Sequence, residues 1–384
     1  MKKNISFYMH LLVFVLFSGS LEAQVGLTKA AATKMSTLMI SEIIEAQKEK
    51  AAASWAKGEI NIKDKKLKFA YHVFGDKPVD GRSLYISMHG GGNTESTVND
   101  QQWENQFYLY RPSEGVYVAP RAPTNTWNLW HEDHVDDFFE QLIKDAIIME
   151  DVNPNKVYIM GYSAGGDGTF QLAPRMADYW AAASMMAGHP GDASALGLRN
   201  LPFSIFMGGA DDAYQRNEHA VSWGEKLDSL QKTAPGFYIH DVHVFPGMPH
   251  WMDRKDSIAM PWMAKFKRNP LPTKVVWHQD DRLRSRFYWL GLPEEGMIAH
   301  AETIVSILEN TITIEKNDNP TLYIYLNDRM LNLDKKVKVV YKGTVIFNKK
   351  IKRTSATISE TAKRIDKDLI FYSRLTLKNG QVIL

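Results

Sequence analysis

The sequence predicts an α/β fold, a mostly parallel sheet with helices on both faces, followed by a small C-terminal β-sandwich-like domain. Between residues 65 and 270, apolar runs of strand length alternate with segments of helix length. Such alternation is typical of a parallel sheet covered by helices. After the proline-rich segment 269–272 the pattern changes to short β runs separated by turn residues, as in two-sheet β domains. A chain of 384 residues is long enough for both parts.

Composition limits the chemistry and the partners. A formal net charge of +2 provides no long-range field that would favour nucleic acid or an anionic membrane. The chain has no cysteine, which excludes a thiol nucleophile, disulfide bonds, a lipid anchor on cysteine and cysteine-ligated metals. Ten tryptophans are on the rich side and suit a pocket for apolar or sugar-containing ligands.

Residues 1–23 have the pattern of a secretory signal peptide. Lys2 and Lys3 precede an apolar run over 11–17, and the small residues that follow predict cleavage after Ala23. The alternative, a membrane anchor, is disfavoured because the apolar run is too short to span a bilayer. We therefore expect a secreted or periplasmic protein with no membrane anchor after cleavage.

The mature chain divides into three predicted segments. Residues 24–64 are an N-terminal helical segment, in which apolar residues at helical spacing predict a helix over 27–57 that lies on the next domain. Residues 65–270 form the α/β domain, and residues 271–384 form the β-rich domain. The predicted strands of the α/β domain cover 83–88, 115–119, 156–160, 181–186, 203–207 and 237–245, and its helices include 138–149 and 218–230.

A G-x-S-x-G segment centred on Ser163 follows the strand predicted over 156–160 and precedes a helical segment. Strand, tight turn with a serine, then helix is the context of a nucleophile elbow. The small glycines allow the sharp turn, and the helix N-terminus points N–H groups at the place where negative charge develops in acyl transfer. The five-residue pattern is weak alone, so its surroundings decide its meaning.

A His-Gly-Gly-Gly loop at 89–92 directly follows the strand predicted over 83–88. Its glycines let backbone N–H groups approach a substrate oxyanion with no Cβ in the way. A phosphate-binding loop needs other glycine spacings, which are absent here. We therefore predict an oxyanion hole formed by the N–H of Ala164 with that of Gly90 or Gly91.

The acid and the base must come from loops at the same edge of the sheet. Asp211 and Asp212 both follow the strand predicted over 203–207, and Asp211 is favoured because it directly continues the Gly-Gly turn. His250 lies in a glycine- and proline-rich loop after the last strand. We predict that His250 takes the proton from Ser163 and that Asp211 orients the imidazole.

Three other histidines are weaker candidates for the base. His240 and His243 fall inside a predicted strand, where a structural imidazole is the simpler interpretation. His189 ends a strand but precedes both aspartates, whereas a hydrolase of this type has the order Ser, Asp, His.

Aromatic and imidazole side chains near the same edge are expected to line the substrate pocket. The candidates are Trp127, Trp130, His131, His189 and Trp251. The stretch 131–134 lacks the H-E-x-x-H spacing of a zinc site, and we interpret it as the start of a helix with acidic residues in its first turn. No metal or other cofactor is expected.

The His-Gly-Gly-Gly loop, the G-x-S-x-G segment, the turn 208–212 and His250 together resemble the α/β-hydrolase superfamily. Within it the chain is most similar to secreted carboxylesterases of the poly(3-hydroxybutyrate) depolymerase-like and prolyl-oligopeptidase-like group. The resemblance covers roughly residues 65–265 and not the C-terminal domain. It implies a metal-free serine hydrolase, usually of esters. The absence of cysteine is a departure, since some secreted members carry disulfides.

The resemblance implies hydrolysis of carboxylic esters through an acyl-serine intermediate. Export, tryptophan-rich loops and the added β domain favour acyl or aromatic esters on polysaccharides, so the expected partner is a small-molecule or glycan-linked ester and not a nucleic acid. A serine peptidase is one alternative, because the same three residues cleave amides. A non-catalytic glycan-binding protein is another. The oligomeric state and the role of the C-terminal domain stay open.

Overall fold

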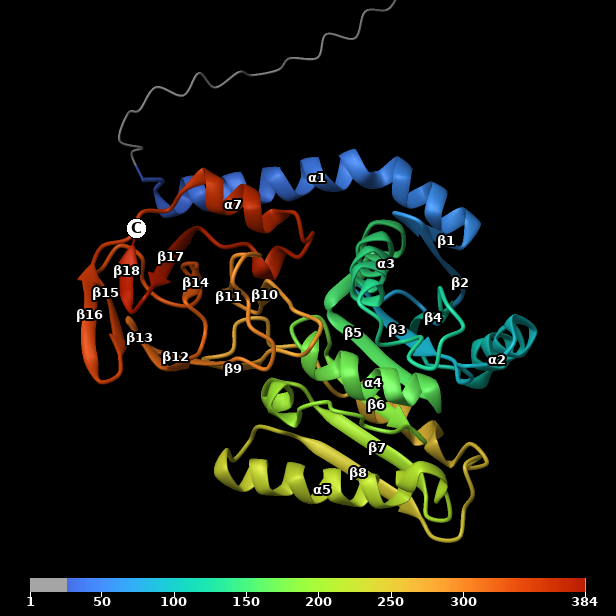
Figure 1. Ribbon diagram of the computed structural model, residues 1–384. Helices are drawn as coiled ribbons and strands as arrows, with labels where there is room; N and C mark the ends of the chain where they lie inside the picture. Colours follow the sequence, from blue (N-terminus) through green and yellow to red (C-terminus); the bar gives the residue numbers. More distant parts are fainter. Residues whose placement is uncertain (1–25, 384) are drawn as a thin grey trace, which may run out of the picture.

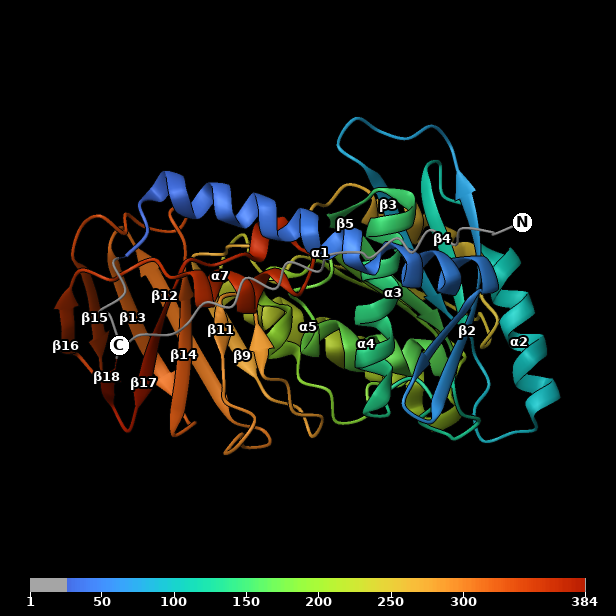
Figure 2. The ribbon, with the colours of Figure 1, turned by 90° about the horizontal axis from the view of Figure 1, so that it is seen from above.

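The computed structural model of this protein describes residues 26–383, so the signal peptide expected over 1–23 lies outside the described residues. An eight-stranded sheet forms the centre of one part of the molecule, and two five-stranded sheets form the other (Figure 1). Seen from above, the two parts lie side by side along the length of the molecule (Figure 2).

The eight-stranded sheet has the order β1-β2-β4-β3-β5-β6-β7-β8. Neighbours from β4 to β8 run parallel, whereas β1 and β2 form an antiparallel hairpin at one edge. The strands are β1 (Glu59–Ile62), β2 (Lys65–Phe74), β3 (Arg82–Met88), β4 (Gly115–Arg121), β5 (Val152–Tyr162), β6 (Ala182–Met186), β7 (Phe203–Gly208) and β8 (His240–Phe245). β1 starts before residue 65, where the sequence predicts the start of the α/β domain.

Helices connect the parallel strands, because parallel neighbours need a crossover. They are α2 (Ser96–Leu109), α3 (His134–Glu150), α4 (Ala164–Arg175) and α5 (Arg216–Thr233), with the short α6 (Ala259–Met263) after β8. Every residue of β4 is buried. Since successive side chains of a strand point to opposite faces, both faces are covered there. The sheets and helices fit an α/β-hydrolase fold. None of the helices within residues 26–383 is long and apolar enough to cross a bilayer.

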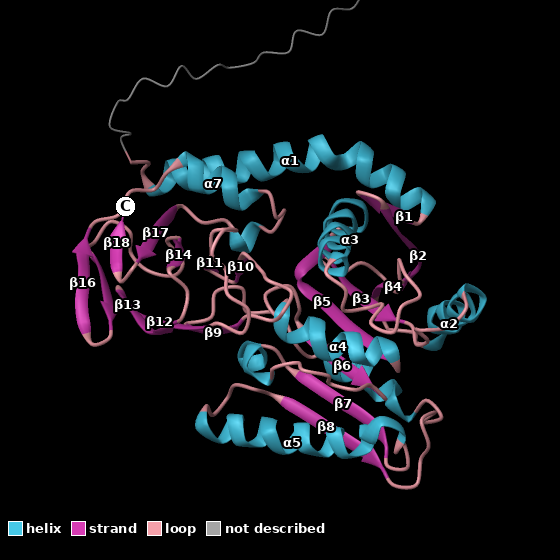
Figure 3. Cartoon of the chain, viewed as in Figure 1, coloured by secondary structure: helices cyan, strands magenta, loops and turns pink. Residues whose placement is uncertain are grey.

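Residues 274–383 form the two five-stranded sheets, ordered β10-β11-β14-β17-β18 and β16-β15-β13-β12-β9. Strands dominate this part, with α7 (Ser355–Ala362) beside them (Figure 3). The strands are β9 (Lys274–His278), β10 (Arg286–Phe287), β11 (Leu290–Gly291), β12 (Glu302–Leu308), β13 (Thr311–Asn317), β14 (Thr321–Leu326), β15 (Val337–Tyr341), β16 (Thr344–Lys349), β17 (Ser373–Lys378) and β18 (Gln381–Ile383). The sequence does not predict β12 or β18. The β-sandwich-like arrangement and the domain boundaries stay predictions.

The helix α1 (Lys29–Lys57) lies across both parts of the molecule (Figure 2). Near its start Ala32 is buried in a small apolar cluster with residues of α7. Near its end Trp55 is 4% exposed and donates its indole N–H to Glu150 at the end of α3, at 2.8 Å. The sequence predicts a helix that lies on the α/β domain. The structure places α1 on α3 of that part and also on α7 of the other, because its two ends bury side chains against different elements.

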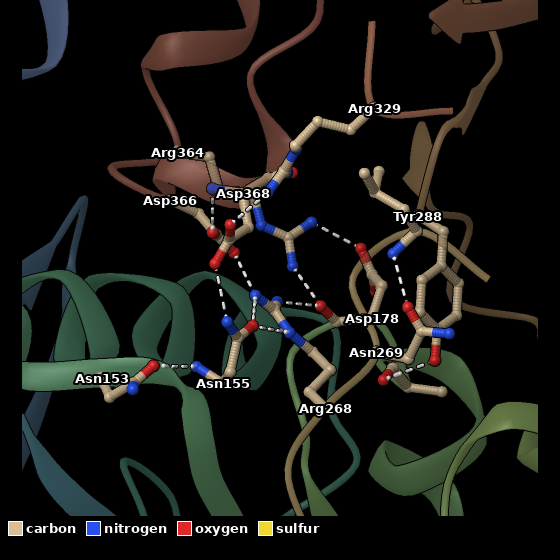
Figure 4. A network of polar contacts seen from close by, with 12 residues as sticks. Asn153, Asn155, Asp178, Arg268, Asn269, Tyr288, Arg329, Arg364, Asp366 and Asp368 are labelled. Carbon is tan, nitrogen blue, oxygen red and sulfur yellow. Dashed lines mark hydrogen bonds and ion pairs between the residues drawn. The ribbon is translucent and has the colours of Figure 1, made fainter. Parts of the chain in front are cut away.

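A polar network joins the two parts beneath α1 (Figure 4). The guanidinium of Arg268 donates to the backbone oxygen of Asp178 at 2.5 Å and to the carboxylate of Asp366 at 2.6 Å. It also donates to the side-chain oxygen of Asn155 in β5, at 2.7 Å. Arg364, just after α7, donates to the carboxylate of Asp178 at 2.5 Å. Each buried charge has an opposite charge within hydrogen-bond distance.

Because Arg268 is 5% exposed, its removal leaves the carboxylate of Asp366 buried without this partner. We predict that Arg268→Ala lowers the free energy of unfolding by about 3 to 5 kcal/mol, measured by urea denaturation. The matched control is Lys77→Ala, which breaks an ion pair with Asp151 whose side chains are 50% and 70% exposed. That change should cost at most about 1 kcal/mol. Equal losses in the two variants would contradict the prediction.

Candidate active site

The turn between β5 and α4 carries Ser163 in a backbone conformation that is unusual for a residue with a Cβ, with φ 58° and ψ −119°. The flanking glycines do not have positive φ. Glycine is required at these positions because a side chain would collide with the neighbouring backbone. A Cβ at Gly161 would lie 2.2 Å from the backbone oxygen of Gly165, and a Cβ at Gly165 would lie 2.2 Å from that of Met88. The sequence predicts that the glycines permit the turn; the structure gives close backbone packing as the reason.

Ser163, His250 and Asp211 form a continuous hydrogen-bonded chain. His250 Nε2 lies 3.0 Å from Ser163 Oγ, and His250 Nδ1 lies 2.6 Å from Asp211 Oδ2. A carboxylate only accepts, so Nδ1 carries the hydrogen of the neutral ring and Nε2 is left to accept from the serine hydroxyl. This arrangement can remove a proton from Ser163 while the buried carboxylate balances the charge that forms on the imidazole.

Backbone hydrogen bonds hold the acid loop against the histidine loop. The N–H of Gly209 donates to the oxygen of Phe245 at 2.8 Å, and the N–H of Ala210 donates to that of Met248 at 2.9 Å. The two loops follow β7 and β8, which are neighbours in the sheet. Asp211 and His250 therefore meet although they are 39 residues apart.

The structure separates the two candidate acids. Asp211 is 3% exposed, and its second carboxylate oxygen lies 3.7 Å from a guanidinium nitrogen of Arg216. Asp212 is exposed and makes no side-chain cap bond to the helical turn that follows it. Only Asp211 is placed against the histidine.

The three other histidines have different partners. His240 Nε2 lies 3.1 Å from the carboxylate of Asp228. His243 is stacked on Phe206, with ring centroids 4.9 Å apart. His189 accepts from the N–H of Gly191 at 3.0 Å, so the structure gives it a local turn contact in place of a bond to the serine.

Tyr162, inside the motif, joins the turn to the histidine loop. Its hydroxyl donates to the backbone oxygen of His250 at 2.6 Å and accepts from the N–H of Met252 at 3.1 Å. Burial raises the pKa of Tyr162 well above its usual value, so the hydroxyl keeps the hydrogen that it donates. The strand that presents the serine thus also positions the loop that presents the imidazole.

A buried histidine holds the His-Gly-Gly-Gly loop in place. His89 Nε2 accepts from the N–H of Ala122 at 3.1 Å, so Nδ1 carries the hydrogen and donates to the backbone oxygen of Gly90 at 2.5 Å. Burial lowers the pKa of His89 to about 3, which keeps the ring neutral. His89 is therefore a structural residue of this loop.

One glycine of this loop, Gly90, lies against the serine. A Cβ at Gly90 would be 3.2 Å from the Cβ of Ser163. Gly91 has φ 102°, and a Cβ there would be 2.3 Å from the side-chain oxygen of Asn99. Ala164 is the first residue of α4, where backbone N–H groups have no partner within the helix. The loop and the helix start therefore face the same point from two sides.

Ser163 and His250 line a cavity of about 560 Å³. The helix α2 forms one wall with the amide side chains of Gln102 and Gln106, and Trp251 forms part of another. The described residues that line it include no aspartate, glutamate, lysine or arginine. The imidazole of His250 and the phenol of Tyr162 are the only ionisable groups among them. This cavity suits an uncharged group.

The predicted pocket residues do not all reach this cavity. Trp251 lines it and is 47% exposed. Trp127 and His131 line a separate hollow of about 640 Å³. Trp130, predicted to face the pocket, is fully buried and donates its indole N–H to the backbone oxygen of His89 at 2.7 Å. His189 is also absent from the described lining of the cavity. Trp130 belongs to the support of the glycine loop.

The stretch 131–134 leads into α3, which begins at His134 and has Asp136 and Asp137 in its first turn, whereas Glu132 and Asp133 precede the helix. Within residues 26–383, no group of three or more histidine and acidic side chains is placed to hold a metal ion.

Asp167 is an ionisable group beside the site that sequence reasoning did not assign. It lies one helical turn after Ser163, and its carboxylate accepts from the N–H of His189 at 2.6 Å. Burial raises the pKa of Asp167 to about 6, although that hydrogen bond and the charges of Arg216 and His250 oppose the shift. The four-residue spacing from the serine was the available signal, because residues four apart share a helix face.

Sequence reasoning also missed α2 and the role of Tyr162. The helix has many polar residues and no apolar stripe, so hydrophobic periodicity does not reveal it. Tyr162 occupies a variable position of the motif, and its bond to the histidine loop spans 88 residues. No local pattern carries that information.

No family model matches the sequence, and no curated protein sequence is significantly similar to it. Among solved structures, the chain is similar to a thermostable esterase, with 18% identity over 55% of this chain and 62% of that chain and a TM-score of 0.42. The chain thus spans less than two thirds of that esterase. It is also similar to a ferulic acid esterase, with 15% identity over 54% of this chain and 96% of that chain and a TM-score of 0.41. For Est1E from Butyrivibrio proteoclasticus the identity is 15% over 54% of this chain and 95% of that chain, with a TM-score of 0.36. Because these TM-scores are low, a function for this protein has to be argued from the geometry of its own site.

The pKa of Asp167 is raised on folding, from 3.8 to about 6, so the folded state binds this proton more tightly than the unfolded state. Its contribution to stability is present below pH 4 and is lost as the pH rises through 6. Asp167→Asn keeps an acceptor for the N–H of His189 but cannot ionise. We predict that the variant unfolds like the wild type near pH 4 and is more stable by about 3 kcal/mol at pH 8, measured by urea denaturation. A difference that is independent of pH would contradict this.

Proposed function

We propose that this protein is a serine hydrolase of the α/β-hydrolase superfamily that cleaves carboxylic esters through an acyl-serine intermediate. The observation that carries the proposal is the hydrogen-bonded chain from Ser163 through His250 to Asp211, with distances of 3.0 and 2.6 Å. A serine hydroxyl is a weak nucleophile near neutral pH and needs an adjacent base. His250 lies at hydrogen-bond distance to serve as that base.

The reaction has two halves. Ser163 Oγ attacks the ester carbonyl while His250 takes its proton, and Asp211 stabilises the imidazolium. The alcohol then leaves with the proton from His250, and the acyl group stays on the serine. Water attacks the acyl-serine with His250 again as the base. The carboxylic acid departs and Ser163 regains its hydrogen, so one ester and one water yield one acid and one alcohol.

The negative oxygen of each tetrahedral intermediate needs hydrogen-bond donors. We assign this role to the backbone N–H of Ala164 with that of Gly90 or Gly91. Gly90 lies against Ser163, and Ala164 directly follows Ser163 in the chain. In other hydrolases each such donor is worth about 3 kcal/mol of transition-state stabilisation.

The cavity favours an ester over a peptide with a charged terminus. Its described lining offers no carboxylate to bind an amine and no lysine or arginine to bind an acid. Trp251 presents an aromatic face, and Gln102 and Asn105 present amides, a combination that suits a sugar or aryl group beside the ester. We therefore propose acyl or aromatic esters, free or carried on a polysaccharide, as the substrate class.

Two further features belong to the same proposal. The signal peptide predicted over 1–23 would take the enzyme to the periplasm or outside the cell, where glycan esters occur. The two five-stranded sheets would form a β-sandwich-like domain beside the hydrolase part.

The first test is hydrolysis of p-nitrophenyl acetate and butyrate by residues 24–384, followed by feruloyl and acetyl esters of xylan fragments. We predict that Ser163→Ala loses at least about 1,000-fold in kcat and no longer reacts with a fluorophosphonate probe. Ser222→Ala, whose hydroxyl bonds only within α5, is the matched control and should keep full activity. An inactive wild type that reacts with no probe would exclude the proposal. Binding of glycan without turnover would then favour a non-catalytic protein.

Tyr162 is predicted to be a positioning residue for the histidine loop. Tyr162→Phe removes the bond to the backbone oxygen of His250 and should lower kcat about fivefold, because one hydrogen bond is worth about 1 kcal/mol. The KM should change little, since the cavity keeps its shape. Tyr108→Phe on α2, with Tyr108 58% exposed, is the control. Equal changes in kcat and KM would contradict a positioning role.

A further inference from the structure

Another cavity, of about 520 Å³, lies where the two parts of the molecule meet. The helix α3 supplies Asp137, Glu140 and Lys144 to its lining, and α7 with the residues after it supplies Glu360 and Arg364. The segment 282–286 supplies three arginines. None of the described residues of this cavity lines the cavity of Ser163.

Three of the four arginines in this cavity already have carboxylate partners from the protein. The pairs are Arg282 with Asp137 at 3.3 Å, Arg284 with Glu140 at 2.7 Å and Arg364 with Asp178 at 2.5 Å. Burial favours the neutral form of any base, and such pairs offset that cost. These three guanidinium groups are therefore part of the structural support of the junction.

Arg286 is different. The Nε of its guanidinium has no hydrogen-bond partner among the described residues, and its Nη1 forms a long ion pair with Glu360 Oε1, at 3.8 Å. That carboxylate is already engaged, since Oε1 accepts from Tyr325 at 2.5 Å and Oε2 accepts from Arg374 at 3.1 Å. The guanidinium lies 3.7 Å from the centre of the Tyr325 ring. This contact orients the guanidinium but does not accept a conventional hydrogen bond from it.

Lys144 adds a second cation without a close carboxylate partner in this cavity. In the part of the chain that the structure describes, no carboxylate lies within ion-pair distance of its amine, and the nearby Glu140 is bonded to Arg284. Lys363 and Glu294 also line the cavity. Burial lowers the pKa of both Lys144 and Arg286 below their usual values. Burial is the main cause of both shifts, and the negative charges of Glu140 and Glu360 oppose it only in part.

We propose that this cavity binds a sugar-sized molecule that carries a carboxylate or phosphate group, held by Arg286 and Lys144. A planar guanidinium presents two parallel N–H donors that match two oxygens of such a group. The 27% exposed side chain of Arg286 can present them to a ligand. A cavity of about 520 Å³ falls in the range that holds small organic ligands. The site is separate from Ser163, so binding does not depend on the proposed hydrolysis.

The test is isothermal titration calorimetry of residues 24–384 at low salt with three probes: glucuronate, glucose 1-phosphate and glucose. We expect the wild type to bind at least one of the two anions and not the neutral sugar. Binding of glucuronate alone assigns a carboxylate ligand, binding of glucose 1-phosphate alone assigns a phosphate, and both assign the shared oxyanion chemistry.

Arg286→Gln should weaken anion binding at least about tenfold, the loss typical of a charge-assisted hydrogen bond. Lys144→Gln should weaken it as well. Lys316→Gln is the matched control, because it removes the same charge from an exposed position on β13 that is 46% exposed. Ester hydrolysis, measured in parallel, should be unchanged in all three variants.

Three results would overturn the proposal. The first is no binding of either anion by the wild type at concentrations up to about 10 mM. The second is equal binding by Arg286→Gln and the wild type. The third is an equal loss in Lys316→Gln, which would indicate a general effect of charge. If Arg286→Gln does not fold, Lys144→Gln alone decides, and unchanged binding in that variant contradicts the site.

Discussion

The packing of backbone against backbone at the turn around Ser163 is the constraint on which the rest of the site depends. Gly161 and Gly165 have no room for a Cβ, and the chain reverses from β5 into α4 through the positive φ of the serine itself. That geometry exposes the hydroxyl, points the first N–H groups of α4 at the same place and leaves Tyr162 directed at the histidine loop. A larger residue at either glycine would displace all three features together.

The cavity of Ser163 and the cavity at the junction of the two parts differ in the charges of their linings. Around Ser163 the described walls of the cavity carry no carboxylate, lysine or arginine. The carboxyl group of Asp167 is largely buried one helical turn after the serine, and the carboxylate of Asp211 is buried behind the imidazole. A low local dielectric strengthens the interaction of that carboxylate with a developing imidazolium. At the junction, three of the four arginines have a carboxylate within hydrogen-bond distance, whereas Arg286 has a longer ion pair with Glu360, at 3.8 Å. Lys144, Lys363 and Glu294 complete the charged lining. The first cavity can accept a neutral group, and the described lining of the second holds more basic than acidic side chains.

The junction is held by elements from every part of the chain. α1 packs on α3 at one end and on α7 at the other, and Arg268 connects β5 with the residues after α7. Such a junction couples the two parts through buried charges, whose separation is costly when one partner is lost. It also creates the concave, arginine-rich surface that neither part forms alone.

The sequence by itself determined the alternation of strands and helices, the serine turn and the order of Ser163, Asp211 and His250, because periodicity, glycine spacing and chain order are local properties. Only the tertiary structure decided which of two adjacent aspartates meets the histidine, and that Trp130 is buried while Trp251 faces the cavity. The polar helix α2 and the position of Arg286 in the junction cavity were equally invisible in the sequence. Burial and partnership depend on residues far away in the chain, and no local pattern records them.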